Sequence, residues 1–266
     1  MLHPQALQKA FNDVPNDVWR DVFRKCGCEH APMLRRVCKG MQTVVDAMLL
    51  PAAVRMCPVY WYKEPAAHAT SLQRLGAVAR RTTVTTLALL CCEPTVHGLR
   101  RVLELCPHLQ RLAVASRDSL GPVGTAIIAQ GLGHATALAH LQLSRNAIDL
   151  EGMRALVPVL AASRGLRHLD LSANSLGDGG VAVLAEGLKL CMKLAHLNLS
   201  LNKLQAGAAQ TLSLSLHLYT ALTELNVAQN HFNNVGAAFL AAALPGCNIE
   251  SLNISHNRCV CGDVLD

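Results

Sequence analysis

Five stretches of the chain share one pattern of apolar and polar positions, L-x-x-L-x-L-x-x-N, with other aliphatic residues replacing some leucines. Their first residues lie 28, 28, 28 and 27 positions apart. A fixed period of this size is typical of a solenoid, in which each repeat packs against its neighbours. The five stretches are residues 138–146, 166–174, 194–202, 222–230 and 249–257.

Two earlier stretches, residues 84–92 and 109–117, keep the three apolar positions and lack the asparagine. Alternating leucines in L-x-L are expected to point into a core, as successive side chains of a strand point to opposite faces. Together with the five clear stretches, they predict about seven strands.

A second register predicts a helix between successive strands. A small residue follows each of four asparagines by six positions, and large aliphatic residues follow it four and eight positions later. This spacing places them on one face of an α-helix packed on the sheet. The small residues are Gly152, Gly180, Ala208 and Gly236, and the aliphatic ones are Leu156, Leu160, Leu184, Leu188, Leu212, Leu216, Leu240 and Leu244.

This unit of strand and full helix resembles the ribonuclease-inhibitor type of leucine-rich repeat over about residues 82–260. The resemblance implies an α/β fold, a leucine-rich-repeat solenoid with a curved parallel sheet inside and helices outside. The asparagine column is predicted to be structural, because each asparagine sits where the chain turns away from a strand and its amide can bond backbone groups that the turn leaves unpaired. The column consists of Asn146, Asn174, Asn202, Asn230 and Asn257.

Side chains that alternate with the leucines are predicted to face the concave side of the solenoid, where they are free to contact a partner. One column reads Thr86, Arg111, His140, His168, His196, Glu224 and Ser251, and the next reads Ala88, Ala113, Gln142, Asp170, Asn198, Asn226 and Asn253. The candidate partner-binding residues on this face are Arg111, His140, Gln142, His168, Asp170, His196, Asn198, Glu224 and Asn226.

Three histidines fall on neighbouring strands, about 4.8 Å apart. Protonated together they would repel by about 1–3 kcal/mol per neighbouring pair, so we expect His140, His168 and His196 to be mostly neutral near pH 7. A zinc site formed with Asp170 is an alternative, but parallel stacked side chains fit tetrahedral zinc poorly. The sequence favours a polar binding stripe, with no metal and no cofactor.

Residues 14–50 carry apolar residues at helical spacing, which predicts a small all-α segment. It resembles an F-box in Val14-Pro15-Asn16-Asp17, Trp19, Val22-Phe23 and the run from Leu34 to Lys39, with Val14 in place of the usual leucine and Met41 where tryptophan is frequent. The resemblance implies docking on a Skp-family adaptor of a cullin–RING ubiquitin ligase. The implied docking residues are Val14, Pro15, Trp19, Val22, Phe23, Leu34 and Val37.

The predicted organisation is a leader (residues 1–13), the F-box-like helical domain (14–50), a connector and N-terminal cap (51–81) and the leucine-rich-repeat solenoid (82–266). Three prolines interrupt the connector, and its aromatic cluster Tyr60-Trp61-Tyr62 is expected to pack over the first turn of the solenoid. Residues 14–50 could also serve only as a helical cap.

Charge is unevenly distributed along the chain. Residues 1–81 hold 12 Lys or Arg and 6 Asp or Glu, whereas residues 82–266 hold 12 of each. The basic residues form no long run, which fits an acidic protein partner better than nucleic acid. We predict no membrane partner, since no run of 18 apolar residues occurs. Eleven scattered cysteines and the absence of a signal peptide indicate a cytoplasmic or nuclear protein.

The motifs of common catalytic sites do not occur, so we predict no enzymatic activity. Two weaker hypotheses are a zinc site at Cys26, Cys28, His30 and Cys38, whose spacing is unusual, and Ran-type GTPase activation through Arg117 or Arg145. The favoured function is a substrate-recognition subunit of a Skp–cullin–F-box ligase. The alternative is a stand-alone leucine-rich-repeat scaffold or an inhibitor-like binding protein.

Overall fold

The computed structural model describes residues 53–56, 84–90, 96–115 and 120–258. The chain divides into two units, residues 1–51 and 52–266, and every described residue belongs to the second. The predicted F-box-like helices and the Tyr60-Trp61-Tyr62 cluster therefore lie outside the described residues.

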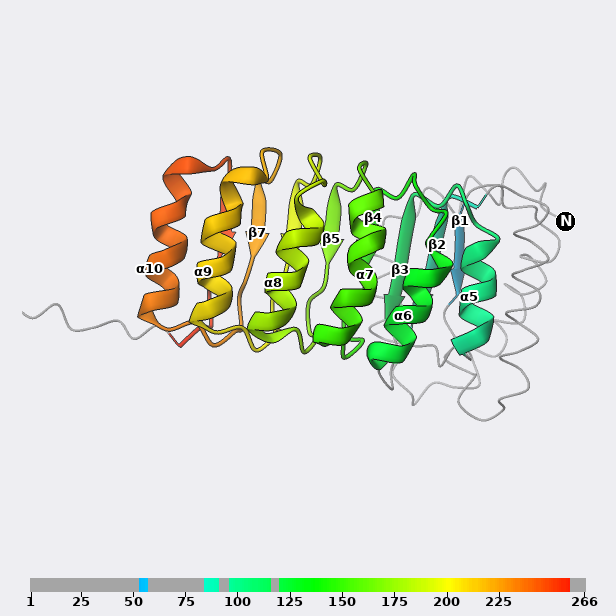
Figure 1. Ribbon diagram of the computed structural model, residues 1–266, viewed down its shortest axis with the longest axis horizontal. Coiled ribbons are helices and arrows are strands. Elements are labelled where there is room, and N and C mark those ends of the chain that lie inside the picture. Colours follow the sequence, from blue (N-terminus) through cyan, green and yellow to red (C-terminus); the bar gives the residue numbers. More distant parts are fainter. Residues whose placement is uncertain (1–52, 57–83, 91–95, 116–119, 259–266) are drawn as a thin grey trace, which may run out of the picture. The chain divides into compact units, whose positions relative to one another are not determined.

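Eight parallel strands form one sheet, and their order in the sheet follows their order in the chain (Figure 1). Equivalent residues of successive repeats pair directly, as Leu141 does with Leu169 and Leu169 with Leu197. The strands are β1 (Ala53–Met56), β2 (Thr86–Leu90), β3 (Arg111–Ala115), β4 (His140–Gln142), β5 (His168–Asp170), β6 (His196–Asn198), β7 (Glu224–Asn226) and β8 (Ser251–Asn253).

All seven strands that the sequence predicts are present, as β2 to β8. The first strand, β1, is an addition to that prediction, because it lies in the stretch 51–81 that we assigned to a connector. It pairs with β2 from Ala53 opposite Thr86 to Met56 opposite Leu89. A four-residue strand without the leucine ladder or the asparagine gives no periodic signal, so only its pairing with β2 reveals it.

One helix follows each of the strands β2 to β7, and the helices form a layer on one side of the sheet (Figure 1). They are α5 (Val96–Glu104), α6 (Gly121–Gly131), α7 (Leu150–Ala162), α8 (Gly177–Leu188), α9 (Ala206–Ser215) and α10 (Asn234–Ala243). Short 3-10 turns extend two of them, η3 (Leu216–Leu218) and η4 (Leu244–Gly246).

The core lies between the sheet and the helices and is almost entirely aliphatic. Strand leucines such as Leu169 and helix leucines such as Leu156 are fully buried, and burying one leucine contributes about 1.5–3 kcal/mol. The predicted small positions allow close packing, since a Cβ on Gly152 would lie 3.1 Å from Ile148 Cγ2. Cys106 and Cys191 are buried free thiols, and burial raises the pKa of each to about 11.

The asparagine column connects each repeat to the one before it. Nδ2 of Asn174 donates to the carbonyl oxygens of Leu143 in the preceding repeat and Leu171 in its own, both at 2.9 Å. Its Oδ1 accepts from the backbone N–H groups of Asn146 and Ile148, both at 3.0 Å. The donation to both repeats also occurs at Asn146, Asn202, Asn230 and Asn257.

The residue before each of these asparagines has a left-handed backbone. Its φ lies between 54° and 60° although none of the five is glycine. This conformation turns the chain out of the strand and costs an L-residue about 1–2 kcal/mol. Each repeat therefore accepts local strain at its turn, which the buried amide bonds offset. The five residues are Arg145, Ala173, Leu201, Gln229 and His256.

Replacing Asn202 with leucine tests the structural role of the column. Asn202 is completely buried and bonds backbone groups of four residues in two repeats. Asn202→Leu leaves those buried groups unpaired, at about 1–3 kcal/mol each, so we expect the free energy of unfolding to fall by about 3 kcal/mol or more in urea denaturation. The exposed Asn234→Leu is the control and should change it by less than about 0.5 kcal/mol. Equal stability of the two variants would contradict the assigned role.

The left-handed turns lead to a second prediction, in which a substitution increases stability. Ala173→Gly should raise the free energy of unfolding by about 1 kcal/mol, because glycine adopts a positive φ without the steric cost. Ala182→Gly, on the exposed side of α8, should lower it by about 1 kcal/mol through the poor helix propensity of glycine. Thermal unfolding of both variants checks the pair, and destabilisation by Ala173→Gly would show that the turn carries no strain.

Candidate functional site

The sheet face opposite the helices corresponds to the predicted concave side, and we call it the open face. Strand leucines point away from it, and the alternating side chains lie on it half-buried or exposed. Strand pairing places the predicted columns in register, with His140 opposite His168 and His168 opposite His196. The open face thus presents rows of side chains one strand apart.

The three histidines form a stack along the first row. Ring centroids of His140 and His168 are 6.0 Å apart, and those of His168 and His196 are 5.5 Å apart. At one end, His196 Nδ1 lies 2.9 Å from Glu224 Oε2. At the other end, the buried Nδ1 of His140 has no hydrogen-bond partner among the described residues.

The surroundings of the stack disfavour protonation of two of its members. Burial lowers the pKa of His140, and the positive charges of Arg111 and Arg167 and the neighbouring histidines lower it further. Burial also lowers the pKa of His168, followed by repulsion from His196, while Asp170 and Glu224 act against this shift. Both directions agree with the expectation that these two rings are neutral near pH 7.

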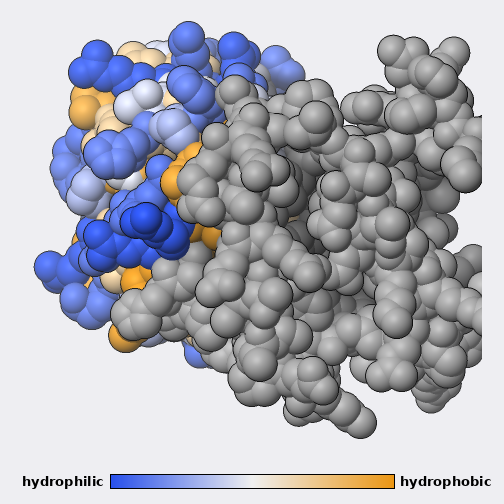
Figure 2. Space-filling model, turned by 90° about the vertical axis from the view of Figure 1, so that its right-hand side faces the viewer, coloured by the Kyte–Doolittle hydropathy of each residue, from blue (hydrophilic) through white to orange (hydrophobic). Residues whose placement is uncertain are grey.

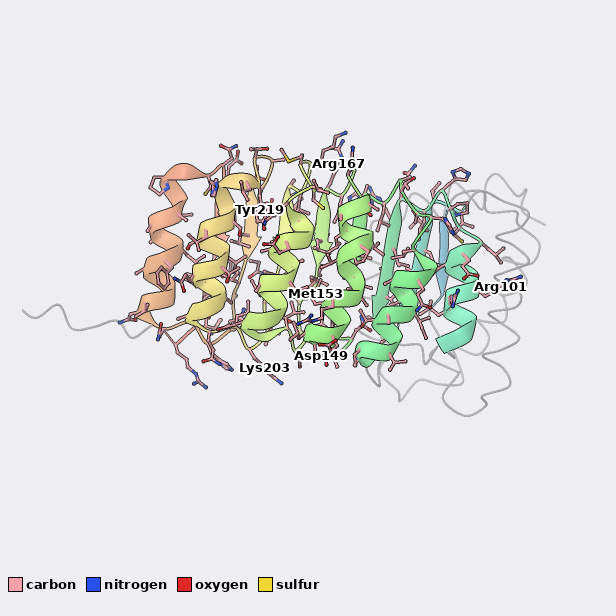
Figure 3. The ribbon with its side chains drawn as sticks, viewed as in Figure 1. Arg101, Asp149, Met153, Arg167, Lys203 and Tyr219 are labelled. Atoms are coloured by element: carbon pink, nitrogen blue, oxygen red, sulfur yellow. The ribbon has the colours of Figure 1, made fainter. Side chains whose placement is uncertain are left out.

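Two arginines border the histidine stack without an anionic partner among the described residues. Arg111 is exposed on β3 and pairs in register with His140, and Arg167 directly precedes His168. Arg167 projects at the edge where the strands begin, whereas Asp149 and Lys203 lie at the opposite edge (Figure 3). Seen from the end that carries β1, the described surface is mostly hydrophilic (Figure 2).

The second row is partly occupied by bonds within its own turns, which the sequence did not predict. The Oδ1 atoms of Asp170, Asn198 and Asn226 accept hydrogen bonds from the backbone N–H two residues later, at 2.9–3.1 Å. Asn253 makes the same bond. Asn and Asp side chains often form such turns. Here the alternation of apolar and polar residues along each strand hides this turn preference in the sequence. These side chains stabilise the turns, and only their polar atoms that are not bonded within the turn are available to a partner.

The described residues contain no second cluster of side chains suited to chemistry. No group of three or more His, Cys, Asp or Glu in the described ranges could hold a metal ion. A cavity of about 400 Å³ lies between α6 and α7, is lined mostly by small and apolar residues such as Ala129 and Ala155, and contains no charged side chain. None of the helices in these ranges is long and apolar enough to cross a membrane.

Several predicted site residues fall outside the described residues. This applies to the cysteines of the proposed zinc site, to Arg117 and to the whole F-box-like docking set. The docking set comprises Val14, Pro15, Trp19, Val22, Phe23, Leu34 and Val37.

Comparison with known proteins identifies the repeats. A family model described as "Leucine Rich repeat" matches residues 134–157, 162–185 and 220–241. No curated protein matches the chain. The repeat match and the observed sheet show that the chain carries leucine-rich repeats in a solenoid, the architecture of a protein-interaction scaffold.

Two solved structures share low sequence identity with the chain. One is an internalin from Listeria monocytogenes, 15% identical, with a TM-score of 0.36 over 68% of this chain and 56% of that one. The other is a protein from Bacteroides fragilis, 12% identical, with a TM-score of 0.47 over 74% of this chain and 63% of that one. The chain thus spans about three fifths of the length of these proteins.

The histidine stack predicts how stability depends on pH. Because the pKa of His168 is lower in the folded protein than in the unfolded chain, the unfolded chain binds more protons as the pH falls below about 6.5. The free energy of unfolding should therefore decrease between pH 7.5 and pH 5.5. His168→Gln should reduce this decrease in urea denaturation, while the exposed His217→Gln should leave it unchanged. The same pH dependence in both variants would contradict the direction assigned to His168.

Proposed function

We propose that this protein is a non-catalytic adaptor that binds a protein partner on the open face and docks on a Skp-family adaptor through residues 14–50. In this role it is the substrate-recognition subunit of a Skp–cullin–F-box ubiquitin ligase. The two binding surfaces belong to different parts of the chain, so each can be tested without the other.

The observation that carries the binding role is the row of aligned polar side chains on the open face. Arg111, the three histidines and Glu224 follow one another on five neighbouring strands, none needed to fill the core. A fold that holds different polar groups at a regular spacing supports recognition of an extended partner surface. The aliphatic core and the asparagine column supply the rigid frame for it.

The docking role is supported by the sequence of residues 14–39. Its Val14-Pro15 pair, the aromatic residues Trp19 and Phe23, and the Val37-Cys38-Lys39 run resemble the F-box. The excess of basic residues in the first 81 positions complements the acidic character that the resemblance implies for the adaptor. Function is therefore assigned from this segment and the open face together, since a repeat fold alone hosts many functions.

A stand-alone scaffold is the second candidate. It is favoured by the same open face and requires only that residues 14–50 cover the end of the solenoid, as terminal caps do in repeat proteins. The two candidates differ in one respect that can be measured, which is binding to a Skp-family adaptor.

Affinity capture of the full chain by a purified Skp-family adaptor tests the docking role. We expect the wild-type chain to bind and Phe23→Ala to weaken binding at least tenfold, because buried aromatic anchors dominate such interfaces. His168→Gln, on the open face, is the control and should bind as the wild type does. Circular dichroism of each variant verifies that it is folded.

Failure of the wild-type chain to bind would remove the F-box assignment and leave the stand-alone scaffold. Equal weakening by Phe23→Ala and His168→Gln would place the contact outside the proposed docking residues.

A further inference from the structure

Resting on the proposed binding role of the open face, we propose that the part formed by β3, β4 and β5 recognises an acidic segment of the partner protein. A carboxylate of that segment lies between Arg111 and Arg167, beside His140, and the segment binds more tightly as the histidines take up protons. The proposal specifies the chemistry of the partner and a regulation of its binding by pH.

The first support is the pair of arginines without a counter-ion. Four Lys or Arg residues in the described ranges, on or beside the helices, form ion pairs with glutamates; Arg100 Nε, for example, lies 2.7 Å from Glu104 Oε1. Arg111 and Arg167 form none with any described residue. Guanidinium groups bind carboxylates through paired, charge-assisted hydrogen bonds, so these two are suited to an anion supplied by a partner.

The second support is His140, which is next to Arg111 in the row and whose ring is close enough to feel the charges of both arginines. Its Nδ1 is buried and unpaired within the described part of the chain. A buried polar atom without a partner costs free energy, and a movement of the ring that brings Nδ1 to a carboxylate at the surface recovers that cost. A protonated Nδ1 donates a hydrogen bond to a carboxylate, whereas a neutral ring offers one donor and one acceptor.

Charges at the other end of the row determine where the acidic segment binds. Glu224 on β7 already pairs with His196 and would repel a second carboxylate there. Asp170, beside His168, accepts a hydrogen bond from the backbone N–H of Ser172 through one oxygen and places a carboxylate on the face. The positive charges beside the described part of the row therefore belong to Arg111 and Arg167, next to His140.

Proton uptake follows from the charges that face the stack. From β3 to β7 these are Arg111, His140, Arg167, His168, Asp170, His196 and Glu224. In the free protein, burial and the arginines lower the pKa of His140, and burial and His196 lower that of His168. A bound carboxylate raises both again, so the complex holds more protons than the free protein and affinity increases as the pH falls.

The balance of charge distinguishes an acidic protein segment from other occupants. The first 81 residues of the chain carry an excess of basic residues, which makes them unsuited to this positive site. Nucleic acids bind through a series of phosphate contacts. Among the described side chains at the open face, two are arginines, and Asp170 and Glu224 lie on the same face, so a short segment with one or two carboxylates fits it better.

A labelled peptide, acetyl-Gly-Glu-Glu-Glu-Glu-Gly-amide, serves as the probe, with its glutamine counterpart as a control. We expect saturable binding to the full chain by NMR, with shifts of the His140 and His168 ring signals and a raised pKa for both. Affinity should be roughly tenfold higher at pH 5.5 than at pH 7.5, equivalent to one unit of pKa shift on one histidine. Glutamate side chains stay mostly charged at both values.

Variants that remove positive charges without changing the fold locate the site. Arg111→Gln with Arg167→Gln should weaken peptide binding at least fivefold. The matched control is Arg154→Gln on α7, whose exposed side chain pairs with Glu151 on the helix layer, and it should bind as the wild type does. Equal losses in both variants would indicate unspecific attraction and overturn the proposal.

Three further results would overturn it. These are no saturable binding of the glutamate peptide, equal affinity at pH 5.5 and pH 7.5, and tighter binding of a six-residue oligothymidylate than of the peptide. Capture by the Skp-family adaptor is measured in parallel on the same preparation. Normal capture without peptide binding refutes this inference alone, whereas peptide binding without capture refutes the docking role alone.

Discussion

The hydrogen bonds of the asparagine column are the constraint on which the rest of the solenoid depends. One amide serves two repeats, since Nδ2 of Asn174 bonds the carbonyl of Leu143 and its Oδ1 accepts from Asn146 and Ile148. A repeat that shifted by one residue would leave these buried groups unpaired and turn every strand leucine to the open face. The column thus fixes the register between neighbouring strands, and the aliphatic core fills the space that this register defines.

Register is also what gives the open face its chemistry. Because each strand pairs residue for residue with the next, side chains that are 28 positions apart in sequence become neighbours, and three histidines come together as a stack. Their closeness and partial burial oppose protonation of His140 and His168, as does the positive charge of Arg111. The same closeness makes the stack responsive to a negative charge that approaches it, since one carboxylate acts on several rings. A structural constraint of the frame therefore sets the electrostatic behaviour of the surface.

Much of this arrangement could be predicted from the sequence, because it recurs with the repeat of about 28 residues. The strands β2 to β8, the helices α7 to α10, the buried asparagines and the neighbouring histidines all follow from one repeated spacing. Features without a period could not be predicted in this way. Strand β1 has no ladder, the left-handed turns occur at residues as different as Arg145 and Ala173, and the bonds of Asp170 and Asn198 depend on the turn geometry. The missing partner of His140 likewise depends on which atoms surround its ring.

The division between frame and surface explains why the clearest signal in the sequence is the least informative about function. In the stretch 166–174, Leu166, Leu169, Leu171 and Asn174 are buried and serve the fold, whereas His168 and Asp170 lie on the open face. Substituting the first group changes stability, and substituting the second changes what the surface attracts. Any partner is therefore selected by positions that the repeat leaves free. For this protein those positions combine arginines that have no anionic partner among the described residues with histidines that resist protonation at one end and a paired glutamate at the other. The face is therefore polar along its length, and this difference between its ends is the reason for placing the proposed acidic ligand beside the arginines.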